Sequence, residues 1–202
     1  MNVQEIINDF GICYFEKDLN LDFNNINKCN LFFLDNLPEI VDYKNVSKYE
    51  QFEVLFPYKI TCSKTYKEYC DFEIKFLKIF DKLWLYSKVD AGITDFYIKP
   101  NKISRYLPYS NRNVIVRFSR DDKPNILFDV EKKIQIESYA MLGLRGLAKT
   151  FLYFKNLHCL VLSNWSCFSV LFLKEDYYDF VNEIVKSEGM FLRKLKTLNN
   201  EK

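Results

Sequence analysis

Large aromatic side chains constrain the fold of this chain more than any other feature of its sequence, because most of them must be buried. The 202 residues include 19 phenylalanines, 14 tyrosines and two tryptophans. Each such ring buries about 150–250 Å², and a domain of this size hides roughly 70% of the surface that its unfolded chain exposes. The sequence therefore predicts one dense core that needs no disulfide or metal to hold it together.

The spacing of apolar residues predicts both helices and strands. From Lys64 to about Ser87 they recur three and four positions apart, which predicts a long helix. Further helices are predicted at Ser138–Lys155, with Ser138 as the N-cap, and at Glu175–Lys186. Alternating segments predict the strands Ile12–Phe15, Leu31–Leu34, Asn113–Ser119, Asn125–Glu131, Ile134–Ile136, His158–Leu162 and Cys167–Leu173.

The order of these elements favours the α+β class. Two predicted strands flank a turn at Ser163-Asn164 and form a hairpin, and no linker rich in proline, glycine or serine divides the chain. We expect an antiparallel sheet packed against two or three helices in a single compact domain, residues 1–202.

Charge is distributed unevenly along the chain. Residues 1–60 form an acidic N-terminal part with ten acidic and five basic side chains, whereas the rest carries seventeen acidic and twenty-four basic ones. This asymmetry predicts a charged partner, or an attraction between two parts of the fold. Residues 190–202 are predicted to form a basic tail that frays.

The sequence predicts a cytoplasmic protein that does not enter a membrane. Its first residues lack the cationic start and apolar segment of a secretion signal, and its apolar runs fall far short of the ~20 residues that span a bilayer. The six cysteines show no C-x-x-C spacing, so we expect reduced thiols rather than a zinc site or a disulfide framework.

Groups typical of enzyme active sites are scarce. His158 is the single histidine, and the five glycines form no phosphate-binding loop. We expect His158 to lie in a strand without a catalytic role and Gly143 and Gly146 to let a helix approach the sheet closely, although their G-x-x-G spacing also occurs in a nucleotide-clamping loop. No catalytic residue, cofactor or metal is predicted.

A cationic segment with interleaved tyrosines runs from Lys99 to Lys123. Its seven cations are accompanied by only two carboxylates, Asp121 and Asp122. Exposed cations next to aromatic rings suit single-stranded nucleic acid, whose phosphates and bases they contact, and arginine and tyrosine are also favoured in protein interfaces. A solvated basic face with inward-packed tyrosines is the other interpretation. The predicted partner-binding residues are Tyr97, Lys99, Lys102, Arg105, Tyr106, Tyr109, Arg112, Arg117, Arg120 and Trp165.

A metal-dependent nuclease is a further alternative. Glu131-Lys132-Lys133 has the E-x-K form at the end of a predicted strand, downstream of Asp122. Paired carboxylates in such sites hold Mg²⁺ and the lysine assists the attacking water, and the order of elements resembles the PD-(D/E)-x-K nuclease core. The sequence leaves open whether Asp122, Glu131 and Lys133 converge.

The leading hypothesis is a non-catalytic binding protein that docks on another protein and neutralises or sequesters it. In size and composition the chain resembles toxin-neutralising immunity proteins, although it contains no motif diagnostic of them. The partner would then be another protein, for example a toxin, and the alternative is a single-stranded RNA or DNA binder using the basic, tyrosine-rich strand and loop. The sequence leaves the oligomeric state open.

Overall fold

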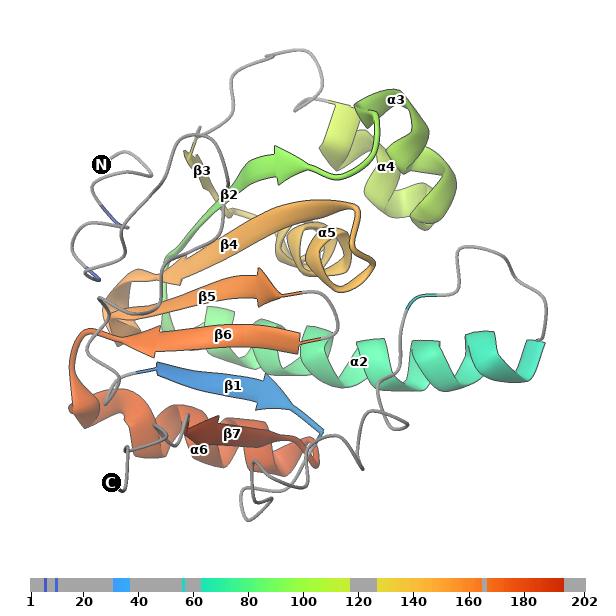
Figure 1. Ribbon diagram of the computed structural model, residues 1–202. Helices are drawn as coiled ribbons and strands as arrows, with labels where there is room; N and C mark the ends of the chain where they lie inside the picture. Colours follow the sequence, from blue (N-terminus) through green and yellow to red (C-terminus); the bar gives the residue numbers. More distant parts are fainter. Residues whose placement is uncertain are drawn as a thin grey trace, which may run out of the picture.

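A computed structural model describes residues 6, 10, 31–36, 56, 63–116, 127–164 and 167–194. Seven strands form one sheet in the order β3-β2-β4-β5-β6-β1-β7, and every neighbouring pair is antiparallel (Figure 1). The strands are β1 (Leu31–Asp35), β2 (Val89–Phe96), β3 (Leu127–Asp129), β4 (Ala148–Phe154), β5 (Cys159–Asn164), β6 (Cys167–Phe172) and β7 (Phe191–Lys194). The α-helices are α2 (Ser63–Tyr86), α3 (Pro100–Ile103), α4 (Tyr109–Val116), α5 (Lys133–Leu144) and α6 (Tyr178–Ser187), and the short 3-10 turns are η5 (Ser104–Tyr106), η7 (Lys155–Leu157) and η8 (Glu175–Tyr177).

This architecture confirms the predicted α+β class with an antiparallel sheet. The long helix predicted from Lys64 to Ser87 is α2, and the predicted hairpin is β5–β6, with Cys159 opposite Phe172 and Asn164 opposite Cys167. None of the helices in the described residues is long and apolar enough to cross a membrane.

The main core lies between the sheet and the helices α2, α5 and α6, which pack on the same face (Figure 1). Phe76 and Phe80 of α2 contact Phe168 of β6, with ring centroids 5.4 and 4.8 Å apart respectively. Alternate residues of the central strands point the other way and form a second cluster, in which Phe10 meets Tyr153 edge to face at 5.9 Å. The central strands are therefore buried on both faces.

Two predicted strands are corrected by the structure. Asn113–Ser119 was expected to be a strand, but its first four residues belong to helix α4, which follows Pro108 and is anchored through Asn111 on α5. Ile134–Ile136 was expected to extend the sheet and instead lies in the first turn of α5. Tertiary contacts override the β-propensity of both segments.

The predicted helix Ser138–Lys155 is confirmed only as far as Leu144, where α5 ends, and the chain then continues as strand β4. Gly146 adopts a left-handed conformation (φ 57°) that favours glycine and ends the helix. Ser138 lies inside α5 rather than at its N-cap, and its hydroxyl donates to the carbonyl of Ile134. An apolar run of this kind suits a buried helix and a buried strand equally well.

At the C-terminus, Phe191–Lys194 is not frayed as expected but forms β7 and pairs with β1. The predicted strand Asn125–Glu131 is confirmed at Leu127–Asp129. Residues 195–202, the predicted strand Ile12–Phe15 and most of the acidic N-terminal part lie outside the described residues.

Candidate functional site

The cationic segment leaves the sheet at the end of β2 and folds into the short helices α3, η5 and α4, drawn in green in Figure 1. Between Asp95 and Asp121 the chain carries no carboxylate. Lys99, Lys102 and Arg105 are exposed, and within the described part of the chain none of them forms an ion pair. Their charges are therefore exposed to solvent and are not neutralised by ion pairs with other described residues.

Exposed tyrosines accompany these cations. Tyr109 at the start of α4 is 82% exposed, and the guanidinium carbon of Arg112 lies 5.9 Å from the centroid of its ring. Arg112 also donates from Nε to the carbonyl of Leu107, at 3.2 Å. Tyr97 at the end of β2 is 38% exposed, and burial together with the nearby Asp95 raises its pKa to about 12. Tyr97 therefore remains protonated at physiological pH, and the ring of Tyr109 is largely exposed to solvent.

Tyr106 is half-buried and faces the protein body rather than solvent. Its ring contacts that of Phe56 edge to face, at 6.2 Å between centroids. We use the name cationic surface for the exposed and half-exposed set Tyr97, Lys99, Lys102, Arg105, Tyr109 and Arg112. Arg117, Arg120 and Trp165, which were also predicted to bind a partner, lie outside the described residues.

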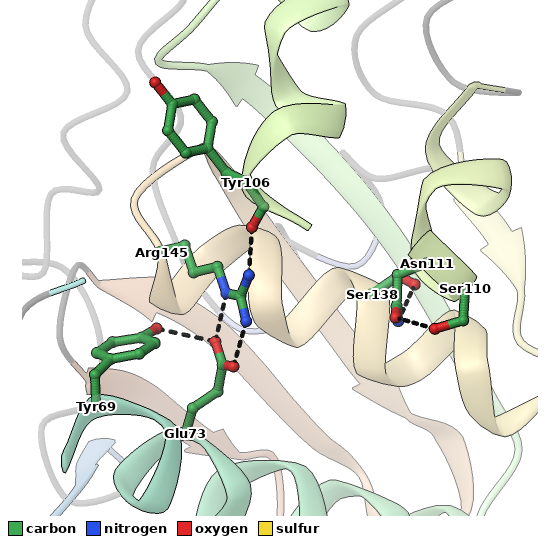
Figure 2. Close-up of polar contacts among 7 residues, drawn as sticks. All are labelled: Tyr69, Glu73, Tyr106, Ser110, Asn111, Ser138 and Arg145. Carbon is green, nitrogen blue, oxygen red and sulfur yellow. Dashed lines mark hydrogen bonds and ion pairs between the residues drawn. The ribbon is translucent and has the colours of Figure 1, made fainter. Parts of the chain in front are cut away.

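Buried contacts hold the helices of the cationic surface against the protein body. Ile103 and Leu107 are buried in the main core. Asn111 donates from Nδ2 to the Ser138 hydroxyl of α5, at 3.0 Å, and accepts a hydrogen bond from Ser110 (Figure 2). An amide and a hydroxyl that satisfy each other in a buried position fix the separation of α4 and α5.

A buried ion pair provides the second anchor (Figure 2). Arg145, just beyond α5, donates from Nε and Nη2 to the two carboxylate oxygens of Glu73 on α2, at 2.7 and 2.5 Å, and from Nη1 to the backbone carbonyl of Tyr106. Both side chains are about 95% buried. Tyr69 donates to the same carboxylate at 3.0 Å, and the ring of Phe56 lies 5.0 Å from the guanidinium carbon. One guanidinium thus connects α2, α5 and the turn η5 below the cationic surface.

The electrostatics of this cluster favour the charged pair. Burial lowers the pKa of Arg145, but the hydrogen bonds and charge of Glu73 outweigh that effect and raise the pKa. Burial, and then the charge of Glu73, raise the pKa of Tyr69, so its hydroxyl remains protonated and can donate. Sequence reasoning missed this cluster. The available signal was Arg145 itself, the single charged residue between Glu137 and Lys149, since a charge in such an apolar stretch needs a buried partner.

The E-x-K triplet lies at the start of α5. Lys133 pairs with Asp81 of α2 at 2.7 Å and with Glu137 at 3.3 Å, and these contacts, with Asp81 first, raise its pKa. Glu131 is exposed, whereas Asp121 and Asp122 lie outside the described residues. Within the part of the chain that the structure describes, no group of three histidine, cysteine or carboxylate side chains is placed to hold a metal.

His158 precedes β5 instead of lying in it, in a left-handed conformation (φ 45°), and its ring is 6.0 Å from that of Tyr177. Burial raises the pKa of the neighbouring Cys159 thiol, which keeps it protonated and unreactive.

The close approach of α5 to the sheet is confirmed at Gly143. A Cβ atom there would lie 2.5 Å from the Cβ of Ser163 on β5 and 2.7 Å from the hydroxyl of Thr150 on β4. Gly143 therefore lets α5 pack on these strands, and the same helix carries Ser138 and leads into Arg145, the two anchors of the cationic surface.

No protein family model, curated protein or solved structure matches this chain.

Proposed function

We propose that this protein is a non-catalytic binding protein, which docks through its cationic surface on an acidic surface of another protein and neutralises or sequesters that protein. One observation carries the proposal: cations without ion-pair partners among the described residues lie in the same short segment as a tyrosine that is 82% exposed. Arginine and tyrosine dominate the energetics of protein interfaces, and a concentrated positive charge accelerates association with an acidic partner.

The anchoring of the surface supports the same function. Arg145 and Asn111 hold its short helices in place before any partner arrives. A surface that is ordered in advance loses little conformational entropy on binding, so more of the contact energy appears as affinity. The free thiols of Cys70 and Cys159 support a reducing compartment, and we propose that the protein acts in the cytoplasm.

Single-stranded nucleic acid is a second candidate partner, which the pairing of Tyr109 with Arg112 favours. A base can stack on an exposed ring while neighbouring cations contact phosphates, and such stacking contributes about 1–3 kcal/mol per base. The two candidate partners can be distinguished by a crosslink formed at position 109, which would attach either a protein or a nucleic acid.

A photo-crosslinking amino acid in place of Tyr109 tests the proposal in cells of the native host. We expect illumination to attach a protein that survives nuclease digestion, whereas nucleic-acid adducts would favour the second candidate. The same crosslinker in place of Lys67, an exposed position on α2, is the matched control. Absence of any adduct specific to position 109 would contradict both candidates.

A further inference from the structure

The exposed cations of α3 and η5 lie in a row. Lys99, Lys102 and Arg105 follow one another at intervals of three residues, and all three are exposed. The backbone from Pro100 to Tyr106 is helical, and the amide of Lys102 donates to the carbonyl of Lys99 at 2.8 Å. Residues three apart on a helix lie on the same side, one turn after another. The three cations therefore form a row along one side of this segment.

Another side of the same segment is buried, which fixes the direction in which the row points. Ile103 and Leu107 belong to the main core, and the ring of Tyr106 packs against Phe56. Arg145 also donates a hydrogen bond to the backbone carbonyl of Tyr106. The segment is therefore anchored on its inner side while the cations on its outer side remain in solvent.

The charge along this row has one sign. The sequence contains no carboxylate between Asp95 and Asp121, and Asp95 lies opposite Lys149 of β4 in the register of the sheet. Within the described part of the chain, no ion pair involves any of the three cations of the row. The row therefore selects a series of anionic groups on the molecule that binds it.

The spacing of the row matches that of side chains on a helix. Three residues of an α-helix or a 3-10 helix advance about 4.5–6 Å along the axis, so the row covers about 9–12 Å. Carboxylates on one face of an α-helix recur every three or four residues, which is also about 4.5–6 Å. Side chains on one face of a strand recur about every 6.6–6.8 Å, so three of them cover about 13–14 Å and extend beyond the row.

We infer that the cationic surface binds an acidic helix of its protein partner, which lies alongside α3 and η5 and carries a carboxylate every three or four residues. The inference rests on the proposed function, because it names the element of the acidic partner that the surface contacts. Three ion pairs form in register along the row. Tyr109 follows four residues after Arg105, and its exposed ring packs on the partner helix next to the last carboxylate.

Two peptides of equal composition test the spacing on the full-length protein. The striped peptide is an alanine-rich helix of about four turns with four glutamates on one face, and the spread peptide has the same residues with the glutamates distributed around the helix. In a nuclear magnetic resonance titration at low salt, we expect the striped peptide to shift the backbone amides between Lys99 and Arg112. It should bind about five- to tenfold more tightly than the spread peptide, because several exposed ion pairs form together.

The outcomes separate this inference from the proposed function. Equal affinity of the two peptides for this surface would overturn the inference and leave the proposed acidic protein partner in place. Binding of neither peptide would count against both. Tighter binding of a single-stranded oligonucleotide than of the striped peptide would overturn the inference in favour of nucleic acid.

A charge-shift variant is the matched control. The double substitution Asn101→Lys and Lys102→Asn keeps the composition and the net charge, but it moves one cation about 100° around the helix and out of the row. Both positions are exposed, so the change should leave the fold intact. We expect the preference for the striped peptide to fall about threefold or more, while the affinity for the spread peptide stays the same. An undiminished preference would show that the row does not read the spacing of the carboxylates.

Discussion

At the scale of single residues, Arg145 determines how the parts of this molecule are joined. Its guanidinium contacts Glu73, which is 72 positions away in the sequence, and the carbonyl of Tyr106, 39 positions away. A buried carboxylate that loses its cation is strongly destabilising, whereas removal of both charges together is much better tolerated. The two side chains should therefore behave as one unit in mutagenesis.

We expect Arg145→Met to lower the free energy of unfolding by about 3–5 kcal/mol, because it leaves the carboxylate of Glu73 buried without a partner. The double variant Glu73→Leu and Arg145→Met should recover part of that loss. Urea denaturation measures both, with Lys67→Met as the control at an exposed position. Additive effects of the two single substitutions would contradict the coupling.

Two buried tyrosine hydroxyl groups should make the stability of the folded state depend on pH in the alkaline range. Burial raises the pKa of Tyr139 and Tyr69 above their usual value of 10.0. Each group keeps its proton in the folded state and loses it in the unfolded state, so its contribution is complete below pH 10 and decreases as the pH rises further. Tyr139→Phe removes one such group and should shift the alkaline unfolding midpoint to higher pH, as monitored by circular dichroism. Tyr97→Phe at a half-exposed position should shift it less; a larger shift for Tyr97→Phe would be inconsistent with this assignment.

At the scale of elements, the helices α3, η5 and α4 form a module that is attached to the body by Ile103 and Leu107 in the main core and by a few polar contacts. Asn111 and Ser138 join α4 to α5, and Arg145 joins η5 to both α5 and α2. Elements with few attachments open locally before the rest of the protein unfolds. The rigidity of the cationic surface should therefore depend on these side chains rather than on the sheet.

Hydrogen exchange of the backbone amides checks this dependence. In Asn111→Ala, which leaves the buried Ser138 hydroxyl without its donor, we expect residues 109–112 to exchange about tenfold faster, since the lost hydrogen bond contributes about 1–3 kcal/mol. The amides of β4, β5 and β6 should keep their protection. Lys102→Ala, an exposed change in the same module, should alter neither region. Uniform loss of protection throughout the molecule would show that the module does not open separately.

At the scale of the whole molecule, the elements that local sequence patterns indicate were predictable, whereas contacts between residues distant in the sequence were not. Helix α2 and the β5–β6 hairpin follow from spacings within one segment. The boundary between α5 and β4 was not predictable in this way, because an apolar run suits a helix and a strand equally well. The helix ends where Gly146 adopts a left-handed conformation. Charge and tyrosine content predicted that the segment from Lys99 to Lys123 binds a partner, and this stays a prediction. The helices in its described part, and its anchor through Glu73 and Arg145, were not predictable, because no local pattern reveals that pairing.

The proposed function requires that the cationic surface binds an acidic partner. The most direct measurement is the affinity of the crosslinked partner for the variant Lys102→Glu and Arg105→Glu, by isothermal titration calorimetry at two salt concentrations. We predict at least a tenfold loss of affinity and a weaker salt dependence, because two attractive charges become repulsive. The control variant Lys67→Glu and Lys194→Glu reverses two exposed charges elsewhere and should bind normally. Unchanged affinity in the first variant, or an equal loss in both, would contradict the claim.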